Sequence, residues 1–303
     1  MNMEPQRVGQ RVRIDRRTID AFTAYMTKPS AANFGRVLST PGAELAYAHH
    51  KWSSVTSRKA IDAFWREELG RIRWSKRMAS SIQENDNYLK ARRKAWIDAV
   101  LEYLPRGHIM NSKVYLIGGY DSVVWGEDVA LNLANIKFVK DSREAVYYLV
   151  HELAHAGYFR YRCMPDLAGL GTRRELVEAV KLLTHLEGMG VLSPLKLRVK
   201  EGGLSDGDYR VLMDQGETKA RVREYFEMLR RLEREPDRGI RESDYGILDY
   251  FSARPKRLWY IAGCYMAMKI EGRFGTSALK DMVGRGHGAF FRAYAEIEDP
   301  LSL

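Results

Sequence analysis

Residues 147–158 read YYLVHELAHAGY and contain the pattern His-Glu-x-x-His at His151, Glu152 and His155. An α-helix turns by about 100° per residue, so two residues four apart project from the same side. Both imidazoles can therefore reach one metal ion, and the glutamate beside them can take a proton from water bound to that ion. With 7 histidines in 303 residues, chance produces this pattern in only about 1% of such chains, so we interpret it as a metal site.

The surroundings of the two histidines favour this interpretation over a pair of ordinary core or surface histidines. On a helical wheel the aliphatic residues gather on the side opposite His151; they are Val146, Leu149, Val150 and Leu153. The histidines share their own side with Glu152, Tyr148 and Phe159. A core histidine would lie on the aliphatic side, and a plain surface would carry lysines. We therefore expect a helix whose back packs on the core and whose front lines a cleft.

Strands are expected only directly before this helix. Residues 114–117 (VYLI) are apolar and end at a Gly-Gly pair, and residues 129–139 (VALNLANIKFV) alternate in two short pieces. Asp141 or Ser142 can cap the helix that follows, which we expect to extend to about Tyr161.

Most of the remaining chain has helical periodicity. The helices expected here cover residues 59–69, 81–104, 173–189, 217–234, 255–270, 276–283 and 289–297. We predict a predominantly helical α+β fold with a polar arm (1–15) and a single domain (16–303). That domain consists of an N-terminal helical part (16–110), a part with the sheet and the metal-binding helices (111–190) and a C-terminal helical part (191–303).

A catalytic zinc ion usually has three protein ligands and one water. The candidates for the third ligand on the second helix are Glu175, Glu178, His185 and Glu187. His185 falls on the polar side of the wheel and Glu178 is marginal, whereas Glu175 and Glu187 both lie among aliphatic residues. Periodicity alone leaves these two open. Gly188 follows Glu187, and a glycine beside a ligand lets two helices approach closely, so we prefer Glu187.

The His-Glu-x-x-His stretch resembles the zincin metallopeptidases, and the order of strands, this helix and a second helix is similar to the thermolysin-like (gluzincin) core. This resemblance implies a strand, Val129 to Leu133, that pairs with an extended substrate. Residues 185–190 (HLEGMG) resemble the third-ligand helix of several gluzincin families, which adds to the case for Glu187. In favour of the other candidate, Glu175, its interval from His155 is of the kind seen in thermolysin-like enzymes.

Over most of its length the chain is also similar to a poorly characterised family assigned as zinc-dependent peptidases. The similar segments are residues 39–42 (STPG), 114–120 (VYLIGGY), the His-Glu helix, 260–271 (YIAGCYMAMKIE) and 290–294 (FFRAY). This resemblance implies a peptidase-type site and names no substrate.

Other side chains could complete such a site. Hydrolysis of an amide needs a group that stabilises the developing oxyanion, and the candidates are Tyr265, Tyr260 and His287. By analogy with the C-terminal subdomains of gluzincins, we predict Tyr265. Asp166 is a candidate acceptor for an imidazole N–H. Both cysteines, Cys163 and Cys264, are expected to be buried small apolar side chains.

The net charge, 49 − 39 = +10, allows binding of nucleic acid or another polyanion. The Arg-rich start and residues 92–94 support such binding, but residues 221–241 alternate basic and acidic side chains as a solvated helix does, so we do not favour it. Neither a secretory signal nor an apolar run that could cross a membrane is visible, and two cysteines are too few for a disulfide scaffold. A cytoplasmic location is therefore expected.

We therefore predict a cytoplasmic zinc metallopeptidase that hydrolyses a peptide or protein substrate through a metal-bound water activated by Glu152. His151, His155 and Glu187 are the predicted ligands of Zn²⁺. The alternative is a non-catalytic or regulatory protein with a zincin fold, or a basic DNA-associated binding protein. The sequence leaves the oligomeric state open.

Overall fold

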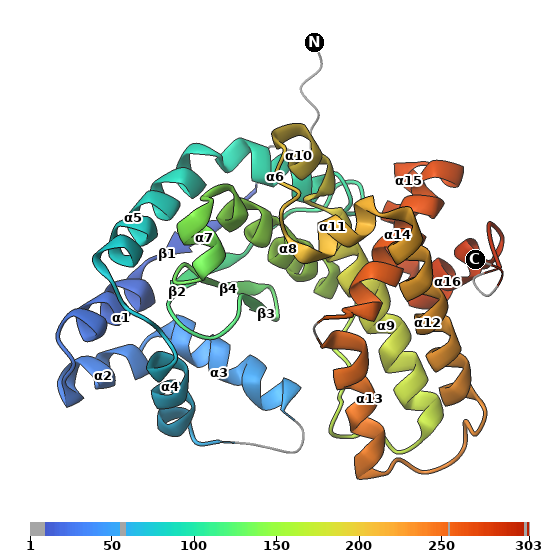
Figure 1. Cartoon of the computed structure of the whole chain (residues 1–303), viewed down its shortest axis with the longest axis horizontal. Helices are drawn as coiled ribbons and strands as arrows, with labels where there is room; N and C mark the ends of the chain where they lie inside the picture. Colours follow the sequence, from blue (N-terminus) through green and yellow to red (C-terminus); the bar gives the residue numbers. More distant parts are fainter. Residues whose placement is uncertain (1–9, 55–58, 254, 300–301, 303) are drawn as a thin grey trace. The chain divides into compact units, whose positions relative to one another are not determined.

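The computed structural model describes residues 10–54, 59–253, 255–299 and 302. The chain divides into two compact units, each with its own elements (Figure 1). Unit 1 comprises the described residues of Met1–Val100 together with Arg106–Arg160, and unit 2 comprises those of Leu101–Pro105 and Tyr161–Leu303. The predicted subdivision of residues 16–303 into three parts of one domain stays a prediction.

Unit 1 is built on a four-stranded mixed sheet with the strand order β1-β2-β4-β3. The strands are β1 (Arg13–Asp15), β2 (Lys113–Ile117), β3 (Val123–Trp125) and β4 (Asp128–Asn132). β1, β2 and β4 are parallel, with Leu116 opposite Leu131, whereas β3 is antiparallel to β4. Helices cover both faces of the central strands, which explains why residues 114–117 of β2 and 129–132 of β4 are all buried and do not alternate between buried and exposed.

The helices of unit 1 include two that cover opposite faces of this sheet. Figure 1 shows α3 on one side of β2 and β4 and α8 on the other, and both helices contact these strands or β3. The bounds of the unit 1 helices are α1 (Arg17–Thr27), α2 (Ala31–Leu38), α3 (Pro41–Ser53), α4 (Ile61–Gly70), α5 (Lys76–Ala91), α6 (Arg93–Leu101), α7 (Ile136–Lys140) and α8 (Arg143–Phe159).

The strand that was expected to pair with substrate has no open edge. β4, at Asp128–Asn132, lies between β2 and β3 and pairs with both, so the expectation for Val129 to Leu133 is wrong. The open edge on this side of the sheet belongs to the short antiparallel strand β3, which was not predicted.

Three further segments of unit 1 differ from the expectation. The predicted helix 81–104 is two helices, α5 and α6, which meet at Arg92. Residues 136–140 form α7 and not a second strand piece, because the side chain of Asn135 accepts a hydrogen bond from the backbone N–H of Lys137 and starts a helix. Residues 13–15 of the predicted arm form β1, and residues 1–9 lie outside the described residues.

Unit 2 is helical around α14, whose middle is buried. Its helices are α9 (Arg173–Leu192), α10 (Leu195–Glu201), α11 (Gly207–Met213), α12 (Gln215–Glu233), α13 (Glu242–Ser252), α14 (Leu258–Phe274), α15 (Thr276–Arg285) and α16 (His287–Ala295). α9, α12 and α14 contact one another and run side by side in Figure 1. Within the described part of the chain, no helix is long and apolar enough to cross a membrane.

α9 and α14 approach each other very closely at two glycines. A Cβ atom added to Gly188 would lie 2.6 Å from Cα of Gly263, and one added to Gly263 would lie 2.8 Å from Cα of Gly188 and closer still to the carbonyl oxygen of Thr184. No side chain fits between the two backbones at this point. The expectation that the glycine after Glu187 allows a close helix approach is therefore confirmed for Gly188.

Candidate metal centre

The helix predicted around His151 is present as α8, Arg143–Phe159. The carboxylate of Asp141 accepts a hydrogen bond from the backbone N–H of Arg143, and Glu144 lies in the first turn, where a negative charge is favourable. The four aliphatic side chains predicted for the back of the helix are all at most 1% exposed; they are Val146, Leu149, Val150 and Leu153. α8 packs on β3 and β4, so the sheet holds this helix in place.

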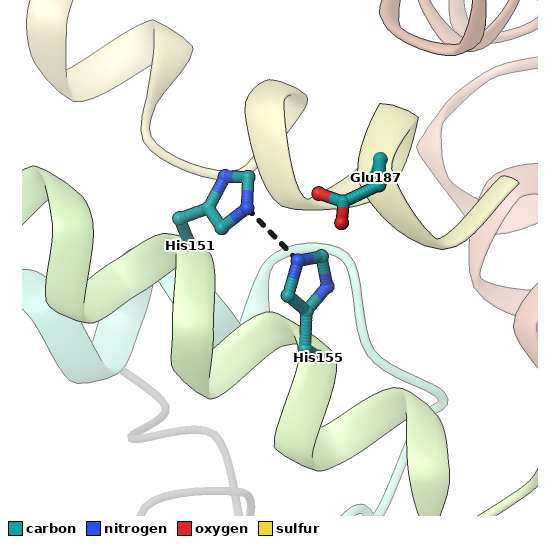
Figure 2. Close-up of side chains that lie close together, drawn as sticks. All are labelled: His151, His155 and Glu187. Atoms are coloured by element: carbon teal, nitrogen blue, oxygen red, sulfur yellow. Dashed lines mark hydrogen bonds between the residues drawn. The ribbon is translucent and has the colours of Figure 1, made fainter. Parts of the chain in front are cut away.

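The two histidine side chains of α8 point toward each other. Figure 2 shows Nε2 of His151 facing Nε2 of His155, and these two nitrogen atoms are 2.8 Å apart. The rings are nearly perpendicular, with centroids 4.4 Å apart. Two nitrogen ligands of one tetrahedral zinc ion lie roughly 3.3 Å apart at the usual bond lengths, so a small rotation of either ring suffices to admit the ion.

The glutamate between the histidines is buried in the same helix. Glu152 is 7% exposed and His155 is 4% exposed, whereas His151 is partly exposed. A carboxylate that is largely withdrawn from bulk water, next to two imidazoles, is the kind of group that can accept a proton during a reaction. α8 thus carries two imidazoles and one buried carboxylate over little more than a single turn.

The two candidates for the third ligand have different surroundings on α9, in unit 2. Glu175 belongs to a capping box: its Oε2 accepts hydrogen bonds from the backbone N–H groups of Gly171 (2.6 Å) and Thr172 (3.0 Å). These backbone hydrogen bonds lower the pKa of Glu175 and hold its carboxylate at the start of the helix. Glu187 lies in the last part of α9, directly before Gly188, and is half-buried.

The two other candidates on α9 have partners within unit 2. Oε2 of Glu178 lies 2.8 Å from Nε2 of His287. His185 was expected on a polar face but is completely buried, and its ring stacks on Phe290 at a centroid distance of 4.3 Å. Burial lowers the pKa of His185 to about 3, and the nearby charges of His287 and Arg162 act in the same direction. α16 covers this side of α9, which the helical wheel could not show.

Glu187 has a charged neighbour that the sequence analysis did not single out. Burial opposes the charge of Arg257, but interactions with Tyr260, Asp208 and the carboxylate of Glu187 outweigh it and raise the pKa of this guanidinium. The pKa of Tyr260 is raised, first by burial and then by the negative charge of Glu187. Arg257 and Tyr260 therefore both lie within electrostatic range of Glu187.

The two tyrosines predicted as candidates on α14 have different environments. The hydroxyl of Tyr265 donates a hydrogen bond to Oε2 of Glu298 at 2.9 Å, and the hydroxyl of Tyr294 donates to the same oxygen at 3.2 Å. Tyr260 instead lies against the guanidinium of Arg257, and the negative charge of Glu187 contributes to its raised pKa. The assignment of Tyr265 as a catalytic residue stays a prediction.

The remaining singled-out residues have structural environments of their own. Asp166 accepts hydrogen bonds from the backbone N–H groups of Ala168 and Gly169 and so holds the loop before α9. Cys264 is buried, as expected, whereas Cys163 is exposed, so the expectation for Cys163 is wrong.

The donor chemistry of these side chains fits a zinc ion. His151, His155 and Glu187 make up the candidate metal-binding group among the described residues, and Figure 2 draws all three. Two imidazoles and one carboxylate are the protein ligands of several catalytic zinc sites, in which a fourth position is left for water or substrate. The His-Glu-x-x-His pattern on α8 is the one found in the class of zinc sites in which a helix carries two histidine ligands and a glutamate base.

A comparison with known families narrows this class. Residues 36–298 match the family described as "Putative zinc dependent peptidase (DUF5700)", and the chain belongs to this family. The resemblance to a poorly characterised family of zinc-dependent peptidases is thereby confirmed. No curated protein and no solved structure matches the chain.

Proposed function

We propose that this protein is a zinc-dependent peptidase with a gluzincin-type site, in which His151, His155 and Glu187 hold the metal. The observation that carries the proposal is the pair of Nε2 atoms on α8, 2.8 Å apart with a buried glutamate between them in sequence. The family of the chain supports it, because that family is described as zinc dependent. The capping role of Glu175 leaves Glu187 as the better third ligand.

The side chains of the chain itself then have distinct roles. A zinc ion bound by these residues would polarise a water molecule and so supply the nucleophile. Glu152 would accept a proton from the attacking water at its carboxylate and pass it to the nitrogen of the leaving amine. The burial of Glu152 limits competition from bulk water for this proton.

For the oxyanion of the reacting amide we prefer Tyr260 to Tyr265. The hydroxyl of Tyr265 already donates a hydrogen bond to Glu298. The pKa of Tyr260, in contrast, is raised in part by the charge of the proposed ligand Glu187, which indicates that the two side chains are near each other. A phenolic hydroxyl with a raised pKa stays protonated at neutral pH, so it can donate a hydrogen bond to a developing negative charge.

The substrate backbone has a candidate docking strand in unit 1. β3, Val123–Trp125, is the edge strand of the sheet on which α8 packs. An extended peptide can add to such an edge through main-chain hydrogen bonds. We therefore propose β3, in place of β4, as the strand that binds an extended peptide substrate.

The test separates metal binding from chemistry with two substitutions on α8. Zinc content and hydrolysis of a peptide library are measured for the wild-type protein, for Glu152→Gln and for His155→Ala. We expect both the wild-type protein and Glu152→Gln to bind one zinc ion per chain. Of these two proteins, Glu152→Gln is expected to hydrolyse the peptides more slowly by about 10²-fold or more. His155→Ala is expected to lose both. Full hydrolysis by Glu152→Gln contradicts the mechanism, and a zinc-free wild-type protein contradicts the site.

A further inference from the structure

Arg257 has an unusual backbone conformation for a residue with a long side chain. It precedes α14 with φ 49° and ψ 48°, in the left-handed region. Within the described part of the chain, only Tyr120 and Arg257 are non-glycine residues with positive φ. Strained residues of this kind persist where the surrounding contacts hold them, and they cluster at functional sites. Glycine would adopt this backbone conformation without strain. The presence of an arginine at this position therefore points to a role for its guanidinium group.

The guanidinium of Arg257 is held along one edge by the carboxylate of Asp208 and on one face by the ring of Tyr260. Its Nη2 lies 2.8 Å from Oδ2 of Asp208 on α11, and its Nε lies 3.0 and 3.2 Å from the two oxygens of this carboxylate. The central carbon lies 3.4 Å from the centroid of the Tyr260 ring. Among the described residues no hydrogen bond occupies Nη1, and the side chain is 23% exposed. The guanidinium is therefore held in place and keeps two N–H donors available.

The close contact between α9 and α14 places this guanidinium near the proposed third ligand. Gly188, which directly follows Glu187, touches Gly263, and Tyr260 lies one helical turn before Gly263. The charge of Glu187 acts on both Arg257 and Tyr260, which agrees with this placement. A permanently charged donor therefore lies within electrostatic range of the residue proposed to bind zinc.

We propose that Arg257 is a substrate-binding residue that takes a carboxylate of the peptide at its free Nη1 edge. This inference rests on the proposed function, because Glu187 marks the reaction site only if it binds the metal. Guanidinium and carboxylate form strong charge-assisted hydrogen bonds, and the Asp208 contact presets the orientation of the fork. The carboxylate can be the C-terminus of the substrate or an Asp or Glu side chain, and both sources present the same two oxygens.

The experiment measures binding of fluorescent peptides to the full-length, zinc-loaded chain. Each peptide is compared with its C-terminal amide and with a form in which Glu is replaced by Gln. We expect one of these changes to weaken binding to the wild-type protein by about tenfold or more. Weaker binding of the C-terminal amide identifies the C-terminus as the carboxylate that Arg257 binds. Weaker binding of the peptide with Gln in place of Glu identifies the side chain instead. Binding that is insensitive to both changes overturns the proposal.

Arg257→Gly is the decisive variant, because glycine keeps the left-handed backbone without strain. It is expected to bind the charged and the neutral peptide equally, whereas the control Lys256→Met keeps the wild-type difference. Lys256 is a suitable control since it is the adjacent cation and pairs with Glu224 and Tyr250 instead. An unchanged preference for the carboxylate in Arg257→Gly overturns the assignment. Every protein compared in this experiment, including the one with Arg257 intact, also carries Glu152→Gln, which is expected to keep the zinc ion but not to cleave the peptide. A chain that fails the hydrolysis test of the proposed function therefore still reports on Arg257.

Discussion

At the scale of single residues, helix periodicity alone predicts that the two histidines lie together, but it does not choose between Glu175 and Glu187 as the third ligand. Two histidines four apart on a helix must lie on one side because helix geometry fixes their directions, and His151 and His155 do. Glu175 and Glu187 have equivalent periodicity. Thr172 and Glu175, however, form the Ser/Thr-x-x-Glu pattern of a capping box, a signal in the sequence that separates the two glutamates.

The first prediction concerns these two glutamates. Glu187→Gln removes an anionic ligand and is expected to weaken zinc binding by at least the roughly 10–100-fold that the loss of an outer-shell partner costs. Glu175→Gln is the matched control on the same helix; glutamine also serves in a capping box, so zinc binding and helix stability should change little. Competition with a chromogenic chelator measures both affinities. Loss of zinc in Glu175→Gln alone would reverse the assignment.

Other residues were misjudged because their partners come from distant parts of the chain. His185 lies on a polar stripe of its own helix, yet Phe290 of α16 covers it. Arg257 was not among the predicted site residues, because the local sequence indicates neither its left-handed backbone conformation nor its contact with Asp208. The choice of Tyr265 over Tyr260 rested on analogy alone and stays a prediction, but the hydrogen bond of Tyr265 to Glu298 could not be foreseen. A helical wheel describes one helix and not the elements that pack on it.

At the scale of elements, the long helices and the central strands were predictable. α8 and α9 begin and end within a few residues of the expected positions, because their apolar periodicity is sustained and Thr172 caps the start of α9. The three-residue strands β1 and β3 are too short to carry a pattern. The order β1-β2-β4-β3 is set by pairing between segments far apart in sequence, so the open edge could not be assigned correctly.

The second prediction concerns the contact between α9 and α14. In Gly263→Ala the new methyl group would meet the carbonyl oxygen of Thr184, and a backbone atom of α9 cannot move away by a rotamer change. We expect a loss of about 3 kcal/mol in the free energy of unfolding, the upper part of the range for over-packing. Because Glu187 lies beside this contact, zinc binding should weaken as well. Urea unfolding and zinc titration measure the two effects.

Gly272 of the same helix is the matched control for this substitution. Nothing lies within 4 Å of a Cβ atom added there, so Gly272→Ala should stabilise the helix by up to about 1 kcal/mol through propensity. If Gly263→Ala is as stable as Gly272→Ala, the close helix approach does not exist in the protein.

At the scale of the whole molecule, the family match covers residues 36–298 and therefore reaches into both compact units. The proposed ligands divide in the same way, with two on α8 of unit 1 and one on α9 of unit 2. The sequence pattern along a single helix indicates the first two of the proposed ligands. The third depends on how distant segments fold, and this explains why periodicity left it open.

The last prediction follows from ligands that are far apart in the chain. A donor set drawn from α8 and α9 binds zinc tightly only when the chain is folded, so zinc stabilises the folded state by mass action. This stabilisation reaches about 4 kcal/mol when free zinc exceeds its dissociation constant 1,000-fold. Removing the ion with a chelator should therefore lower the unfolding temperature of the wild-type protein by several degrees, and adding zinc back should restore it. His155→Ala should unfold at one temperature with or without zinc, since its site lacks an imidazole. A shift of equal size in both proteins would mean that the stabilising zinc binds elsewhere.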